Sequence, residues 1–162
     1  MKIGGRGLRE HLQLLAPLFG FIAAVWVLRM VVYALGASPM MLHIVSVTVA
    51  GRISILLAVV MIHRRRFGGY TNVVAAVFLL ICWEEFLIIA AIIFSILTGI
   101  NNVYGAPQFS GGQSPWVNVA GHLTIGLGSG ALFGAAMGCV LLWMLRKVDP
   151  TADKHKAVGS RH

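Results

Sequence analysis

Four long apolar stretches occupy most of this 162-residue chain and constrain its fold more than any other feature. They cover about residues 12–36, 41–63, 72–99 and 117–145. The hydrocarbon core of a bilayer is about 30 Å thick, so a helix that rises about 1.5 Å per residue needs roughly 20 apolar residues to span it. Every stretch is long enough. The sequence therefore predicts an all-α fold, an integral membrane four-helix bundle with short loops and no soluble domain.

The composition excludes several classes of soluble protein. Hydrophobic residues make up 58% of the chain and charged residues 11%, whereas a soluble domain carries about 45–50% apolar and about 25% charged residues. The net charge of +8 does not indicate a nucleic-acid partner, because the basic residues lie at the ends of the apolar stretches and not on one soluble face. We therefore expect the lipid bilayer, and no nucleic acid, as a partner.

Lysine and arginine are distributed unevenly over the polar segments. They precede the first apolar stretch and follow the second and the fourth: Lys2, Arg6, Arg9; Arg64, Arg65, Arg66; and Arg146, Lys147, Lys154, Lys156, Arg161. Residues 37–40 and 100–116 contain neither residue type. Because cytoplasmic loops are enriched in both types, the pattern predicts that the two termini and the 64–70 loop are cytoplasmic.

The polar segments suggest a single membrane domain. Residues 1–148 are predicted to form this domain, and residues 149–162 are polar and expected to be a disordered cytoplasmic tail. In the outer loop, Tyr104 and Trp116 are expected at headgroup depth, where amphipathic rings are common. The chain has no N-glycosylation sequon, lipidation motif or retention signal, which favours a bacterial inner membrane, that is, the plasma membrane.

Four charged residues lie within the apolar stretches: Arg29, Arg52, Glu84 and Glu85. A charge at the centre of a bilayer costs roughly 2.5–3.5 kcal/mol on insertion scales, so we expect these residues to be paired. Arg52 and Glu84 are nearly equidistant from the short loop that joins their helices, and antiparallel neighbours would bring them to the same depth. The spacing predicts an ion pair between Arg52 and a carboxylate at the midplane.

The two glutamates cannot share a face, because neighbouring residues on a helix point about 100° apart. Glu84 shares a stripe with small and polar residues and is expected inside the bundle. Glu85 lies on a bulkier stripe, where it pairs with Arg29, faces a second subunit or is protonated. Together the four charges form either a neutral staple that fixes helix register, a proton or ion site, or an interface with another subunit.

The fourth stretch carries a ladder of glycines spaced by four, Gly126, Gly130, Gly134 and Gly138. Glycines at this spacing form a shallow groove that admits another helix closely, at a crossing angle of roughly −40°. We expect the first or the second helix of the same bundle in this groove. The alternatives are homodimerisation, a partner subunit or a flat cofactor ring.

Two histidines, His43 and His122, lie near the outer ends of the second and fourth stretches. Facing histidines at matching depth can ligate a b-type haem, so haem b is an alternative. Histidines near a membrane surface more often bind water or headgroups, and we expect no cofactor. Cys82 and Cys139 form no CxxC pair, so no metal site is predicted.

The residue types give no indication of an enzyme. No Ser/His/Asp or Cys/His set is visible in the sequence, and no catalytic residue is assigned. The sequence favours a small polytopic membrane protein that acts by helix packing, as an accessory subunit of a larger membrane complex or as a homo-oligomer. The alternative is a proton-linked carrier of small solutes, or an ion-conducting oligomer, that uses an intramembrane glutamate. No motif resembles a known family.

Overall fold

A computed structural model describes residues 2–106 and 111–149 of the chain. A short antiparallel hairpin, β1 (Lys2–Ile3) and β2 (Arg6–Gly7), precedes the helices. The helical elements are α1 (Leu8–Ala34), α2 (Pro39–Ile44), α3 (Val47–Arg64), α4 (Tyr70–Thr98), α6 (Pro115–Gly121), the π-helical turn η1 (His122–Gly126) and α7 (Leu127–Val148). The predicted disordered tail lies, apart from Asp149, outside the described residues.

The prediction of an all-α bundle is confirmed. Within the described part of the chain, four helical segments are long and apolar enough to cross a membrane: Leu8–Ala34, Pro39–Arg64, Tyr70–Thr98 and Pro115–Val148. Each of them overlaps one of the four apolar stretches. The N-terminal hairpin was not predicted from the sequence, and each of its strands is only two residues long.

The second segment is interrupted between α2 and α3. Ser46 leaves helical geometry with φ −112° and ψ 130° and is the N-cap of α3. Upstream, the Ser38 hydroxyl accepts a hydrogen bond from the Met41 amide, and Pro39 occupies the first turn of α2. These are favourable residues for a helix start. The end of this segment that lies away from the α3–α4 loop is therefore a short helix of its own.

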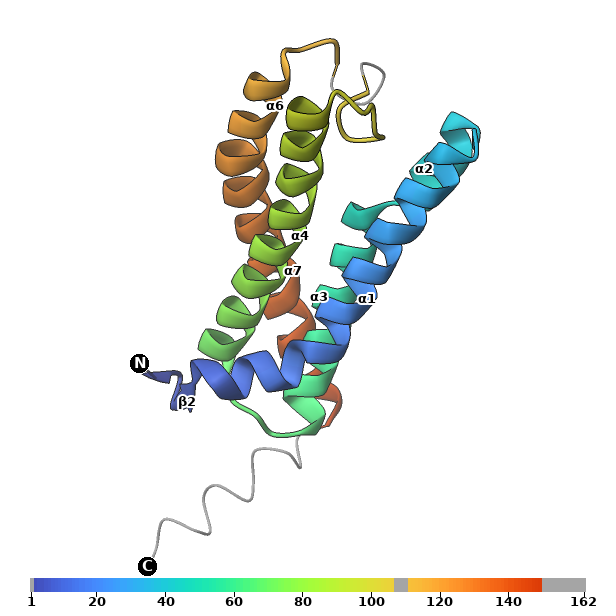
Figure 1. Ribbon diagram of the computed structural model, residues 1–162. Helices are drawn as coiled ribbons and strands as arrows, with labels where there is room; N and C mark the ends of the chain where they lie inside the picture. The colour runs from blue at the N-terminus through green and yellow to red at the C-terminus, as the bar shows by residue number, and fades with distance from the viewer. Residues whose placement is uncertain (1, 107–110, 150–162) are drawn as a thin grey trace, which may run out of the picture.

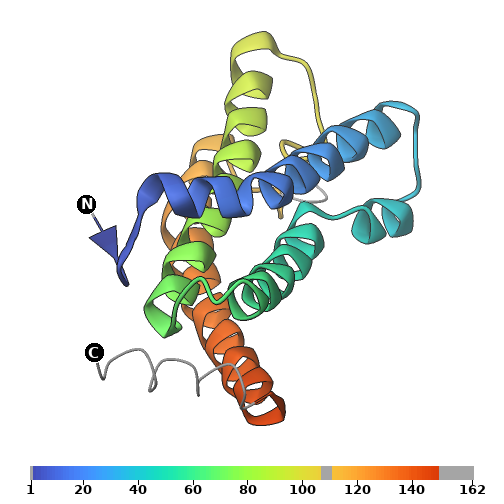
Figure 2. The same ribbon diagram turned by 90° about the horizontal axis from the view of Figure 1, so that it is seen from below.

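The helices form a bundle in which α4 and α7 lie side by side and antiparallel, with α3 packed against both (Figure 1). α1 packs on α3 and α4, and it is bent (Figure 1). It contains Pro17, which removes a backbone N–H and is the usual cause of such a bend. Seen from below, the first turns of α1 cross α4 (Figure 2). The Trp83 indole joins these two helices by a 3.1 Å hydrogen bond to the Phe19 carbonyl oxygen.

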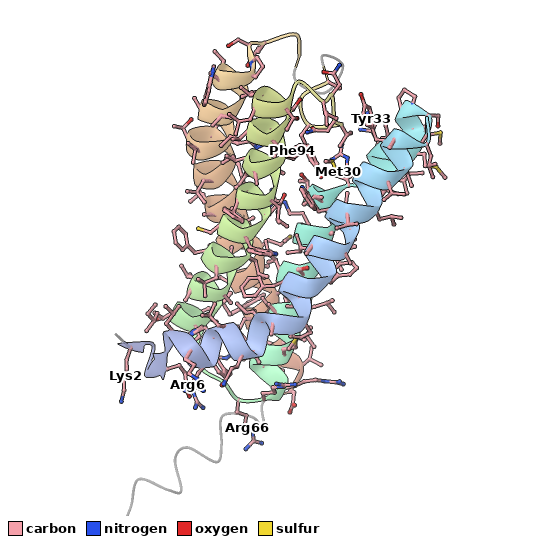
Figure 3. The ribbon with its side chains drawn as sticks, in the orientation of Figure 1. Lys2, Arg6, Met30, Tyr33, Arg66 and Phe94 are labelled. Atoms are coloured by element: carbon pink, nitrogen blue, oxygen red, sulfur yellow. The ribbon has the colours of Figure 1, made fainter. Side chains whose placement is uncertain are left out.

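The N-terminal hairpin packs against the basic end of the bundle. Lys2, Arg6 and Arg66 gather at this end (Figure 3). The Arg6 guanidinium donates a 3.0 Å hydrogen bond to the carbonyl oxygen of Phe67, in the loop between α3 and α4. The buried Asn72 amide donates a 3.2 Å hydrogen bond to the carbonyl of the hairpin turn. The N-terminus is thus tied to the α3–α4 loop.

The segment after α4 turns back into the bundle instead of staying at its surface. Asn102, Val103 and Tyr104 are 4%, 0% and 7% exposed. The Asn102 side chain donates a 2.7 Å hydrogen bond to the carbonyl oxygen of Ala91, about two turns below the end of α4. Tyr104, which lies in the loop after α4, is therefore part of the buried core of the bundle.

Candidate functional site

The glycine ladder of η1 and α7 faces α4 in a regular antiparallel register. The side chains that a Cβ atom at Gly126, Gly130, Gly134 and Gly138 would meet on α4 are those of Glu85, Ile81, Val77 and Val73, at 2.6, 3.2, 2.8 and 2.9 Å. Each step of four residues on one helix matches a step of four on the other. The absence of glycine side chains is what allows this approach.

The second helix in the groove is α3. A Cβ atom at Gly134 would lie 3.0 Å from the Ile55 side chain, and one at Gly138 would lie 3.3 Å from Val59. One turn before Ile55 on α3, the guanidinium of Arg52 lies 3.9 Å from the Cβ position at Gly130. The groove is therefore filled from within the same chain by α3 and α4, and it gives the Arg52 head group its room.

Glu84 occupies the interior between α3 and α4. Its side chain is 2% exposed and rests against Gly51, where any Cβ atom would overlap the carboxylate. The groups of α3 that act on this carboxylate are the Arg52 charge and the Thr48 hydroxyl. Within the described residues, its Oε2 atom has no hydrogen-bond partner. A buried carboxylate oxygen in this state is costly unless a further donor reaches it.

The predicted ion pair between Arg52 and a carboxylate is not present among the ion pairs of the described residues. The two residues do reach similar depth, because Gly51, the neighbour of Arg52, faces Glu84. The Arg52 guanidinium instead reaches over Gly130 and Gly134 on α7, where there is no side chain to exclude it.

Glu85 is paired with a histidine. Its Oε2 atom lies 2.7 Å from Nδ1 of His122, the first residue of η1. A contact this short requires a proton between the nitrogen and the oxygen, since two bare lone pairs would repel each other. The pair bridges α4 to the start of the fourth span, directly beside Gly126. Arg29, one of the partners expected for Glu85, lies against Tyr104 instead, and pairing of Glu85 with His122 was not predicted from the sequence.

Arg29 of α1 lies against the buried segment that follows α4. Its guanidinium carbon is 5.0 Å from the centre of the Tyr104 ring, a cation–π distance. Burial raises the pKa of the Tyr104 phenol to about 12, against the opposing effect of the Arg29 charge. Tyr104 therefore joins α1 to the buried segment that follows α4.

The π-helical turn coincides with the histidine of the pair. η1 runs from His122 to Gly126, and a π-helical turn is frequent at functional positions. In the helix around it, the Thr124 hydroxyl donates to the Ala120 carbonyl at 2.7 Å and Ser129 donates to Ile125 at 2.5 Å. Hydroxyl bonds of this type loosen the regular helix. The turn widens the helix where His122 reaches Glu85.

The two histidines considered for haem are not brought together. His43 lies on α2, which packs on α1, whereas His122 lies on η1 and contacts α4. Figure 1 shows α2 and α6 on opposite sides of the same end of the bundle. Among the described residues, no group of three or more His, Cys, Asp or Glu side chains could hold a metal ion.

The interior positions of three residues were not predicted from the sequence: Thr48, Asn102 and Tyr104. Loop residues usually lie on the surface, so Asn102 was not considered, and Tyr104 was expected near the membrane surface. One signal was present, since Val103 and Tyr104 are adjacent large apolar residues that follow two asparagines in this loop. Comparison of the chain with protein-family models, with curated proteins and with solved structures gave no match.

Proposed function

We propose that this chain is a multi-pass protein of a plasma membrane, with both termini on the cytoplasmic side. The basic end formed by Lys2, Arg6 and Arg66 supports the orientation (Figure 3). The outer surface of the bundle supports the membrane environment, because large apolar side chains such as Leu132 and Phe133 are 69% and 71% exposed. Such a surface is unfavourable in water and favourable in lipid.

Within that membrane, we propose that the protein carries protons, either alone or linked to a small solute. The observation that carries the proposal is the Glu85–His122 pair, with 2.7 Å between Oε2 and Nδ1, which joins two of the four apolar helical segments. A carboxylate and an imidazole that share a proton can pass it on at physiological pH. Ionisable groups in this position commonly belong to proton pathways.

The neighbouring Glu84 strengthens the argument. A structural staple would be expected to neutralise this carboxylate by a direct ion pair, and none is found within the described residues. One of its oxygens lacks a hydrogen-bond partner there although the side chain is 2% exposed. A carboxyl group that exchanges a proton with water or a relay group needs such an oxygen.

A packing role, as an accessory subunit or a homo-oligomer, is the second proposal. The glycine ladder no longer supports it, because that groove is filled by α3 and α4 of the same chain. What favours it is the other side of α7, where a Cβ atom at Gly128 would meet nothing within 4 Å in the described part of the chain. A second helix could approach closely at this position.

Proton flux into dye-loaded proteoliposomes tests the first proposal. We expect the purified protein to acidify the lumen when a membrane potential is applied, and Glu85→Gln to abolish this flux. Glu10→Gln is the matched control, because Glu10 is an exposed carboxylate at the basic end, paired with Arg6 at 3.0 Å. Flux no greater than in protein-free vesicles, or unchanged in Glu85→Gln, would overturn the proposal. A stoichiometric partner in native-membrane mass spectrometry would support the packing role.

A further inference from the structure

The segment between α4 and α6 has an unusual position for a loop. α4 ends at Gly99, whose φ of +71° reverses the chain. The next residues descend along α4, and Asn102 and Val103 are buried within the bundle. In Figure 1 this part of the chain lies between the outer ends of α4 and α1. We call residues 101–106 the re-entrant segment.

Hydrogen bonds hold the re-entrant segment to α4. The Asn102 side chain donates to the Ala91 carbonyl oxygen at 2.7 Å, and its own carbonyl oxygen accepts from the amides of Tyr104 and Gly105 at 2.9 and 3.2 Å. One side chain thus fixes both the depth and the turn of the segment. Because Asn102 is 4% exposed, loss of these bonds would leave buried backbone groups unsatisfied.

Two further contacts fasten the segment to the other helices. The Asn118 side chain of α6 donates a 3.1 Å hydrogen bond to the Tyr104 carbonyl oxygen. The Tyr104 ring packs under the Arg29 guanidinium of α1. The segment therefore joins α1, α4 and α6 at one level of the bundle.

That level is directly outward of the buried carboxylate. Ala91 is two helical turns from Glu84 on α4, or about 10 Å at 1.5 Å per residue. The buried residues 102–104 are held at the level of Ala91, between the end of α4 and the level of Glu84.

We propose that the re-entrant segment is a gate that controls access of water and protons from the outer side to Glu84, with Asn102 and Tyr104 as its positioning residues. In the structure the gate is closed. Opening requires the segment to leave Ala91 and Arg29, after which water reaches the carboxylate. The purpose of the gate rests on the proposed proton function, whereas its position and its opening do not.

Cysteine accessibility tests the gate without any transport measurement. In a Cys82→Ser/Cys139→Ser background, Ala91→Cys places a thiol under the segment, and Thr98→Cys places one at the exposed outer end of α4. A membrane-impermeant methanethiosulfonate reagent is added to the outer side of intact cells. We expect Thr98→Cys to react at once and Ala91→Cys to react slowly.

Opening variants give the decisive comparison. Asn102→Ala and Tyr104→Ala should each accelerate labelling of Ala91→Cys by about ten-fold or more, because each removes an interaction of the closed position. Tyr104→Phe keeps the ring under Arg29 and should leave the rate unchanged, as should every variant for Thr98→Cys. Elution of each variant as a single species from detergent extracts excludes loss of the fold.

The outcomes separate the two proposals. Ala91→Cys that labels as fast as Thr98→Cys in the native segment, or at the same rate in Asn102→Ala and Tyr104→Ala, would overturn the gate. Faster labelling in these variants without any proton flux in the wild type would leave the gate in place and overturn the proton function.

Discussion

Gly51 on α3 lies against the carboxylate of Glu84 on α4, with no space for a side chain between them. The same relationship recurs on the other side of α4, where Gly126 receives Glu85. On α7, Gly130 and Gly134 give room to the Arg52 guanidinium. The glycines thus form recesses for the charged side chains as well as contacts between helix backbones. Arg52, Glu84 and Glu85 each occupy space that a glycine of a neighbouring helix leaves open.

Substitution of Gly51 by alanine tests this dependence. In an ordinary helix interior, Gly→Ala stabilises by roughly 0.5–1 kcal/mol. Here the added methyl group meets Glu84, so we expect Gly51→Ala to lower the stability of the detergent-solubilised protein by about 1–3 kcal/mol instead. The measurement is thermal unfolding followed by circular dichroism. Gly128→Ala is the control, because it has open space and should be neutral or stabilising. Equal changes in stability for the two variants would contradict the close contact between Gly51 and Glu84.

The contact between Glu85 and His122 predicts a coupling that a double-mutant cycle can measure. Directly contacting residues show interaction energies of about 0.5–3 kcal/mol, whereas distant residues are additive. We expect Glu85→Gln and His122→Gln to be non-additive in thermal unfolding by an amount in that range. The control cycle combines Glu85→Gln with His63→Gln, at the far end of α3. Additivity in both cycles would show that the 2.7 Å contact has no energetic role.

Arg52 and Glu84 predict a second, indirect coupling. The Arg52 charge acts on the Glu84 carboxylate without a direct ion pair among those of the described residues. Removing one charge leaves the other buried with less compensation, so Arg52→Gln and Glu84→Gln should each be destabilising. The double variant should be more stable than the sum of the two losses predicts. Unfolding of the three variants in matched detergent measures this, and strict additivity would contradict it.

The sequence was sufficient to predict the apolar helices but not to predict which side chains contact one another between them. Length and hydropathy predicted four apolar segments, because the bilayer thickness fixes the number of residues needed. The common depth of Arg52 and Glu84 followed from counting along two antiparallel helices. The direction of a long side chain did not follow, because Arg52 has rotamers that reach either neighbour.

The same limit applies to the rest of the site. The spacing of the glycine ladder predicted a close contact with the first or the second helix, and the structure fills it with α3, which belongs to the second span, and with α4, which was not expected. Pairing of Glu85 with His122 required the register of α4 on α7, which depends on side-chain packing along the whole interface. The re-entrant position of Tyr104 depends on one buried asparagine, Asn102, a tertiary contact that no local pattern encodes.

Tyr104 gives the final prediction, on pH. Burial raises its pKa to about 12, from an ordinary value of 10.0. A tyrosine is charged only above its pKa, so between about pH 10 and about pH 12 the folded state holds a proton that the unfolded state has released. The stabilisation that goes with this neutral phenol is therefore fully present below about pH 10 and is lost as the pH rises towards about 12. Ultraviolet titration of tyrosinate in the folded protein should show a component near pH 12 that disappears in Tyr104→Phe. If that variant titrates like the wild type, the ring is not buried, and the closed position of the re-entrant segment is wrong.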